Sequence, residues 1–190
     1  RNLMLVGNFN ITNTKELQEA LIQRGIHPVF STDTQAILEE ISFHLDIEHG
    51  EIYRRLRDKG VAGEDILRMM NEELSPLRIV SNAAKNWDGG YAIAGAIGNG
   101  DAFVLRDANG IRPCFYLKND EIIAFASERV PLMTVFEADE SDVKEVPPGN
   151  VFVIKCDGTS YEQPYRPAGK RKSCTFERIY FSRGNDPQIY

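Results

Sequence analysis

The first half of the chain shows the periodicity of helices and the second half that of strands. Before Trp87, apolar residues recur every three or four positions in several segments, as on the buried face of an amphipathic helix. From Trp87 onward, short runs of β-branched, aromatic and small apolar residues alternate with turns rich in Gly, Asn, Asp and Pro, which is typical of strands. Helices followed by antiparallel strands predict an α+β fold in layers, not a wound β-α-β sheet.

The helical half begins with one predicted strand, over residues 1–11, and continues as a series of helices. Asn13 and Glu16 have the spacing of a capping box, which predicts a helix start there, and Gly25 ends that helix. An extended segment and four further helices are predicted at residues 27–30, 31–45, 48–59, 64–74 and 77–86.

The strand half centres on residues 102–128, AFVLRDANGIRPCFYLKNDEIIAFASE. This stretch predicts three strands joined by two tight turns, at Ala108-Asn109-Gly110 and Asn119-Asp120, because Asn, Asp and Gly tolerate the backbone conformations that a hairpin demands. Arg106, Asp107 and Arg112 concentrate charge at the first bend, and composition alone suggests a solvated turn with an internal Arg–Asp ion pair. A strand at 91–97, a short helix at 131–136, a strand ending at 146 and a hairpin over 151–163 are also predicted.

Composition narrows the class of protein. The chain has 190 residues, 42% of them hydrophobic and 26% charged, which suits one globular domain with a sizeable core. It contains no long apolar run and no signal peptide, so we expect no membrane contact, and the net charge of -6 argues against a nucleic-acid surface. Three cysteines without a CxxC pair favour a reducing, cytoplasmic location.

Several segments resemble a known family. RDANGIRP and FASE, within residues 106–128, are similar to the RDPxGIRPL and ASE segments in the glutaminase domain of amidophosphoribosyltransferases. The more specific match is CTFERIYFSRG at 174–184, which resembles the CxFEYIYFARPDS segment leading from that domain into the phosphoribosyltransferase domain. Glucosamine-6-phosphate synthase and asparagine synthetase share the glutaminase fold but lack this exit segment. Two places depart from the family pattern: Arg178 stands in place of Tyr, and Gly184-Asn185-Asp186-Pro187 stand where the family has Pro-Asp-Ser.

The resemblance implies a fold and a division of the chain. The family's glutaminase domain has the layered αββα fold of N-terminal nucleophile hydrolases. Because the chain begins with Arg1 inside an apolar strand, we expect a fragment whose fold is truncated at its N-terminus. Residues 1–165 are then a partial glutaminase domain, the basic RPAGKRK segment at 166–172 is a linker, and residues 173–190 start a phosphoribosyltransferase-like domain.

Residues 7–13, GNFNITN, resemble the family's HNGNLTN segment. The resemblance implies that the Asn8 side chain and the backbone N–H of Phe9 form an oxyanion hole, in which each donor typically raises the rate by a factor of about 10²–10³. Phe9 replaces the family's Gly, which puts the second donor in doubt, because a Phe resists positive φ and its ring is expected to narrow the pocket. A purely structural alternative is that Asn8 and Asn10 only satisfy a strand end.

Two more residues acquire roles by resemblance. Residues 31–34, STDT, are similar to the S-D-S/T-E element whose acid holds the α-ammonium of glutamine, which implies that role for Asp33. A helix N-cap is the alternative for Asp33. Cys174 matches a cysteine that ligates an iron–sulfur cluster in some members; otherwise we expect no cofactor in this chain. Cys114 and Cys156 are expected to be small buried hydrophobes.

The catalytic cysteine of the family, which is N-terminal, and its HxRY(A/S)T segment do not occur in these 190 residues. We therefore expect that the chain alone does not hydrolyse glutamine. The resemblance implies a parent enzyme of purine synthesis that binds glutamine, passes ammonia to a phosphoribosyltransferase domain outside this chain, and forms a homo-oligomer. The alternatives are a catalytically degenerate regulatory or scaffolding homologue, and the glutaminase domain of another class II amidotransferase.

Overall fold

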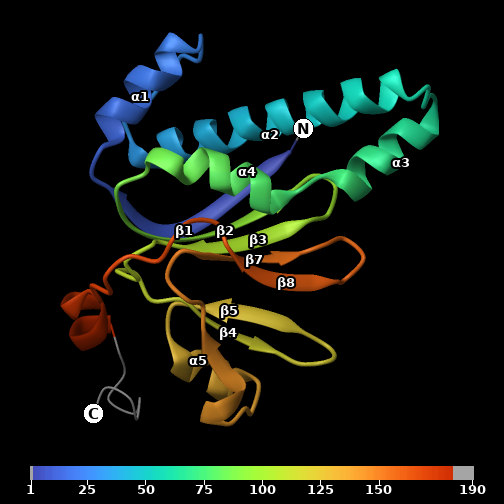
Figure 1. The fold of residues 1–190 in the computed structure, drawn as a ribbon. Coiled ribbons are helices and arrows are strands. Elements are labelled where there is room, and N and C mark those ends of the chain that lie inside the picture. The colour runs from blue at the N-terminus through green and yellow to red at the C-terminus, as the bar shows by residue number, and fades with distance from the viewer. Residues whose placement is uncertain (1, 182–190) are drawn as a thin grey trace.

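The structure is a computed structural model that describes residues 2–181. Four layers follow one another (Figure 1): helices α1 to α4, a five-stranded sheet, a three-stranded sheet, and the short helix α5. All strand pairs are antiparallel. The predicted α+β class with an αββα order of layers is therefore confirmed. Within residues 2–181 no helix is long and apolar enough to cross a membrane.

The helical layer differs from its prediction at one place. The four helices are α1 (Thr14–Gln23), α2 (Asp33–Asp58), α3 (Glu64–Glu73) and α4 (Pro76–Ala83), with a 3-10 turn at Ala84–Asn86. α2 is one continuous helix of 26 residues where two were predicted. Gly50 lies within it and costs about 1 kcal/mol relative to Ala, but Leu45 and Ile52 on either side are buried, and their packing holds the helix together. The segment at 27–30 forms no strand.

The five-stranded sheet has the order β1-β2-β3-β7-β8, so that β1 is an edge strand. Its strands are β1 (Leu3–Ile11), β2 (Gly89–Ile97), β3 (Ala102–Arg106), β7 (Asn150–Ile154) and β8 (Ser160–Pro164). Alternate side chains face the helices and form the main core, among them Ile11, Tyr91, Ile93, Phe103, Leu105, Val151 and Val153. The predicted hairpin of β7 and β8 is confirmed.

The three-stranded sheet packs against the opposite face. Its order is β5-β4-β6, with β4 at Phe115–Lys118, β5 at Ile123–Ala126 and β6 at Val143–Glu145. The rings of Tyr116 and Phe125 lie 5.0 and 5.2 Å from that of Phe152 and join the two sheets. α5 (Arg129–Val135) covers the far side, where Leu132 packs with Leu117 and Val143.

The predicted three-stranded meander is wrong in its first half. β3 pairs with β2 and β7, whereas β4 pairs with β5 and β6, so the two strands belong to different sheets. The Asn109-Gly110 bend, which looked like a hairpin turn, is a crossover between sheets. The second turn is as predicted: Asn119 Oδ1 accepts hydrogen bonds from the backbone N–H groups of Glu121 and Ile122.

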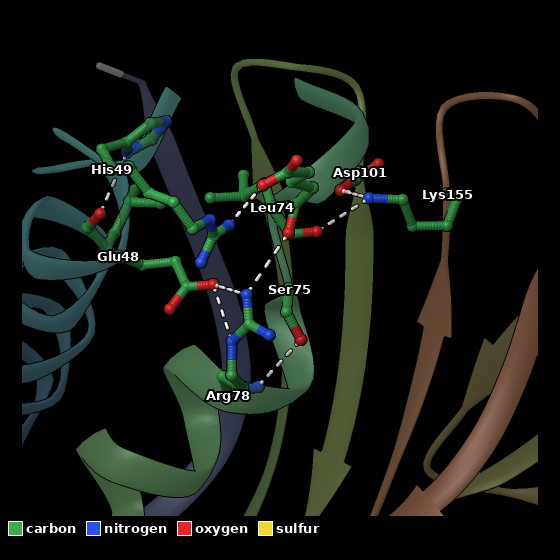
Figure 2. A network of polar contacts seen from close by, with 10 residues as sticks. Glu48, His49, Leu74, Ser75, Arg78, Asp101 and Lys155 are labelled. Atoms are coloured by element: carbon green, nitrogen blue, oxygen red, sulfur yellow. Dashed lines mark hydrogen bonds and ion pairs between the residues drawn. The ribbon is translucent and has the colours of Figure 1, made fainter. Parts of the chain in front are cut away.

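A polar network fastens the helices to one end of the five-stranded sheet (Figure 2). Asp101, which is fully buried, accepts a 3.0 Å hydrogen bond from the backbone N–H of Cys156 and forms an ion pair with Lys155. Lys155 Nζ also donates to the backbone O of Leu74 at 3.0 Å. Nearby, Arg78 of α4 pairs with Glu48 of α2. These contacts are structural, and the candidate site lies at the other end of the sheet.

Candidate functional site

Arg106 and Asp107, which begin the RDANGIRP segment, are both buried and have structural roles. Asp107 is fully buried, and its carboxylate accepts four backbone N–H groups. The donors are Tyr91 at 3.2 Å, Asn109 at 3.0 Å, Ile111 at 3.0 Å and Arg112 at 3.1 Å. The prediction of a solvated turn with an internal Arg–Asp ion pair is therefore wrong. The Asp107 carboxylate accepts the hydrogen bonds that a neighbouring strand would otherwise accept from the backbone N–H groups of the crossover, so that these groups can be buried.

Arg106 closes the same loop from its other side. Its guanidinium donates to the backbone O of Arg112 at 2.6 Å, of Val146 at 2.7 Å and of Gly110 at 3.3 Å, and pairs with Glu145 at 2.7 Å. Burial alone would raise the pKa of Glu145, but the Arg106 charge and hydrogen bonds from Arg106 and Arg171 outweigh it and hold the pKa below its ordinary value.

Arg112, the second arginine of the loop, faces the end of β1. Its guanidinium pairs with the carboxylate of Glu177, whose side chain is 7% exposed. The same oxygen, Glu177 Oε1, accepts a 2.8 Å hydrogen bond from Asn8 Nδ2. A cavity of about 240 Å³ lies beside this group, lined by Asn8, Arg112, Pro113, Ser127, Glu128 and Glu177.

Phe9 keeps its ring out of this cavity. The ring packs against the core on the helix side of β1, whereas the neighbouring Asn8 side chain is on the other face. The ring of Phe9 therefore does not narrow this cavity. Its backbone does not take positive φ either, since among the described non-glycine residues only Glu137 does.

The backbone N–H of Phe9 lies at the free edge of β1. Phe9 is paired with Tyr91, whose N–H and C=O both bond to Asp107 on the β3 side, at 3.2 and 2.8 Å. The pair is thus a non-hydrogen-bonded one, and the N–H of Phe9 points away from β2. Ile11, two residues on, confirms the direction: its N–H donates outward to Asp33 Oδ2 at 3.3 Å. A backbone donor next to Asn8 is therefore present without glycine.

Asp33 lies at this same edge, at the start of α2. Besides the bond from Ile11, it accepts a 2.8 Å bond from its neighbour, the N–H of Thr34. The N-cap is Thr32, whose hydroxyl accepts from the N–H of Gln35 at 3.3 Å, so the alternative that made Asp33 the cap is wrong. The half-buried carboxylate of Asp33 retains acceptor capacity for a cation.

Thr12 and Asn13 fix the end of β1. Thr12 Oγ1 donates to Asp88 Oδ2 at 2.8 Å, and Asn13 bonds both the backbone O of Asn86 at 2.8 Å and the N–H of Asp88 at 3.0 Å. Asn13 makes no side-chain cap bond to α1, so the predicted capping box is not formed. The last residues of the GNFNITN segment therefore hold the strand end in place instead of starting the helix.

The cysteines differ in exposure. Cys114 is buried, and burial raises the pKa of its thiol to about 12. Cys156, expected to be buried, is exposed at the β7–β8 turn, and Cys174 is half-buried. Iron–sulfur clusters take several thiolate ligands, but residues 2–181 contain no group of three or more Cys, His, Asp or Glu side chains placed to hold a metal. A cluster at Cys174 would need ligands from outside the described residues, and it stays a prediction.

The basic segment at 166–172, predicted to be a linker, makes several contacts with the domain. Arg166 donates to the backbone O of Trp87 at 3.1 Å, and the N–H of Gly169 donates to the O of Ala108 at 2.7 Å. Lys172 N–H bonds the O of Asn109 at 2.8 Å, and Cys174 N–H bonds the O of Ile111 at 3.1 Å. The segment is thus docked on the crossover loop, and Cys174 with it, although the division into domains stays a prediction.

The sequence pointed to Asn8, Phe9 and Asp33 as candidate site residues, but it did not point to Arg112 and Glu177, which lie beside Asn8. Both lie in segments already noted for their resemblance, GIRP and CTFE. Nothing local links them, since Asn8 and Glu177 are 169 residues apart along the chain.

Comparisons with known proteins extend over nearly the whole chain. An amidophosphoribosyltransferase of Pasteurella multocida is 33% identical over 188 residues, covering 95% of this chain and 33% of that protein. A putative glutamine amidotransferase of Methanothermobacter thermautotrophicus is 26% identical over 81% of this chain and 41% of its own length. The structure of glutamine phosphoribosylpyrophosphate amidotransferase from B. subtilis, with ADP and GMP, aligns at a TM-score of 0.68 with 23% identity, covering 95% of this chain and 33% of that one. No family model matches.

The layered fold and its solved neighbours identify the class: this is the αββα fold of N-terminal nucleophile amidotransferases. Within that class, the sequence is similar to amidophosphoribosyltransferases over 95% of the chain, which confirms the predicted resemblance to that family. The chain spans about a third of the length of these relatives.

Proposed function

We propose that this chain is the glutaminase part of an amidophosphoribosyltransferase-like protein and that it binds glutamine at the free edge of β1. The observation that carries the proposal is the placement of Asn8, the N–H of Phe9 and Asp33 along one strand end. From Asn8 to Ile11, which bonds Asp33, the strand rises about 10 Å. This span suits a small amino acid held at both ends by hydrogen bonds of about 3 Å.

The chemistry of glutamine fits these groups. Its α-ammonium is a cation for the Asp33 carboxylate. Its carboxamide carbon becomes a tetrahedral oxyanion when attacked, and preset donors such as Asn8 Nδ2 and the Phe9 N–H stabilise that charge without reorganising. The identity with amidophosphoribosyltransferases supports this substrate for the whole protein.

The nucleophile is proposed to lie outside this chain. In an N-terminal nucleophile mechanism the attacking thiol and its own α-amino group act together, and the backbone nitrogens of Cys114, Cys156 and Cys174 are all in peptide bonds. Cys114 is also buried with a raised pKa, which keeps its thiol protonated. Ammonia released at the site would pass to a phosphoribosyltransferase domain, where it displaces pyrophosphate from phosphoribosyl pyrophosphate for purine synthesis.

Glutamate and ammonia release from glutamine tests the proposal, measured for the 190-residue chain and for the longest form that the gene encodes. We expect no turnover by the chain above the background of its Asn8→Ala variant. We expect turnover by the longer form, reduced about 10²–10³-fold by Asn8→Ala. The matched control is Asp120→Asn, at the exposed β4–β5 turn.

Two results would contradict the proposal. Turnover by the 190-residue chain would mean that one of its three cysteines is the nucleophile. Inactivity of both forms would instead favour a degenerate regulatory or scaffolding homologue, for which Phe9 at the family's Gly position is the supporting observation.

A further inference from the structure

The C-terminal segment at 166–177, here called the strap, lies along the crossover loop at 107–113. Three backbone hydrogen bonds join them, from Gly169, Lys172 and Cys174 to the carbonyls of the loop, at 2.7, 2.8 and 3.1 Å. The fit is close at Gly169, where an added Cβ would lie 2.3 Å from Asn109 Oδ1. The strap therefore has a defined path, which ends at Glu177 beside β1.

Glu177 connects the strap to the site. Its side chain is 7% exposed, and its Oε1 atom accepts from both Asn8 Nδ2 and the Arg112 guanidinium. Arg112 is itself held through its backbone N–H, which donates to the buried Asp107 at 3.1 Å. A continuous chain of polar contacts thus runs from the buried loop through Arg112 and Glu177 to Asn8.

The geometry restricts how the Asn8 amide can turn. A primary amide has two N–H donors. One of them is directed to Glu177, which leaves the other for an acceptor in the cavity beside Asn8. A bare carboxylate next to a developing oxyanion would repel it, but Arg112 supplies the opposite charge to Glu177. The pair can therefore orient the amide without adding net negative charge to the site.

We propose that Glu177 is a positioning residue for the Asn8 amide, so that the strap couples the chain that follows it to the glutamine site. This inference rests on the proposed function for its kinetic consequence, but the contact itself exists independently of activity. When the strap is docked, the amide is aligned for the oxyanion. When the strap leaves, Asn8 on an exposed strand end loses the acceptor that orients it.

A double-mutant cycle in the longest form of the protein tests the coupling. The variants are Glu177→Ala, Glu177→Gln, Asn8→Ala and the double alanine variant. We expect Glu177→Ala to lower kcat for glutamine hydrolysis about tenfold with KM within about twofold, since a misplaced donor acts mainly in the transition state. Glu177→Gln should recover most of this loss, because its amide oxygen still accepts from Asn8 Nδ2. In the Asn8→Ala background, Glu177→Ala should have no further effect on kcat.

Two kinetic results would overturn the inference. Fully additive losses would show that Glu177 does not act through Asn8. A rise in kcat for Glu177→Ala would show that Glu177 blocks the amide. Glu73→Gln removes a different glutamate–arginine pair, between α3 and α2, and should leave kcat unchanged.

A second readout separates this inference from the proposed function. In a ¹⁵N-labelled 190-residue chain, the side-chain NH₂ signals of Asn8 are assigned by their loss in Asn8→Asp. We expect Glu177→Ala to shift these signals, Glu177→Gln to shift them less, and Glu73→Gln to leave them in place. Unmoved Asn8 signals in Glu177→Ala would refute the contact even in an active enzyme, whereas shifted signals in an inactive enzyme would leave the contact standing and reject only the glutaminase function.

Discussion

Arg106, the last residue of β3, and Arg112, in the crossover loop that follows, are six residues apart, and they have different roles. Arg106 is 1% exposed, and its guanidinium donates to three backbone carbonyls and pairs with Glu145. Arg112 faces the end of β1 and meets Glu177, which also bonds Asn8. The charged residues of the RDANGIRP segment therefore have two roles. Arg106 and Asp107 stabilise the crossover between the two sheets, whereas Arg112 borders the candidate site.

The largest difference should be in stability. Arg106→Ala leaves the partly buried Glu145 and several buried carbonyls without their donor, and we expect a loss of about 3–5 kcal/mol in the free energy of unfolding. Arg112→Ala should cost about 1 kcal/mol, because the end of the strap can carry Glu177 into water. Urea unfolding followed by circular dichroism measures both. Equal losses would remove the distinction between the two arginines.

Asp107→Asn should have the next largest effect. An Asn side chain offers one acceptor oxygen where the carboxylate serves four N–H groups, so buried donors would be left unpaired, at a cost of about 2–3 kcal/mol. Asp120→Asn, at an exposed turn, should stay within about 0.5 kcal/mol of the wild type. A wild-type urea midpoint for Asp107→Asn would mean that the crossover does not depend on this carboxylate.

Low pH should destabilise the folded protein by protonating Glu145, which pairs with Arg106. Because the folded pKa of Glu145 is lowered, its contribution to stability is fully present above the unfolded pKa, near 4.5, and is lost as pH falls through the lower folded value. Urea midpoints taken from pH 7 down to pH 3 should therefore converge for the wild type and Glu145→Gln. A gap between the two proteins that stays constant across this range would contradict the assignment.

The smallest effects are those on thiol reactivity. Cys114 lies beside the Arg106 side of the loop, buried and with a pKa raised to about 12, so its reactive thiolate is scarce at pH 8. Alkylation mapped by mass spectrometry should label Cys156 first, Cys174 more slowly and Cys114 only after unfolding. Labelling of Cys114 in the native protein as fast as Cys156 would show that this region opens.

Elements with a strong local signal could be predicted from the sequence. α3 and the β7–β8 hairpin follow their patterns because the residues that shape them are neighbours along the chain. Two local signals misled. Residues between Leu45 and Ile52 looked like a helix break, but packing carries α2 through them. Asn109-Gly110 looked like a hairpin turn, but the bonds of Asp107 make it a crossover.

The candidate site was predictable only in part for the same reason. Asn8 and Asp33 each lie in a short segment that resembles the family, so each could be named from its own neighbours. Asn8 and Asp33 lie at the same strand end because the backbone N–H of Ile11 donates to Asp33. The hydrophobic periodicity of the sequence does not predict this contact. The role of Glu177 depends on a contact between the two ends of the chain.

The central claim is that glutamine binds at the free edge of β1, and a crystal structure of the 190-residue chain with L-glutamine tests it most directly. Without a nucleophile the ligand should persist unhydrolysed. We predict its α-ammonium on Asp33 and its carboxamide oxygen about 3 Å from both Asn8 Nδ2 and the Phe9 N–H. Glutamine bound elsewhere, or bound at this edge with Asp33 touching only Ile11 and Thr34, would contradict the account.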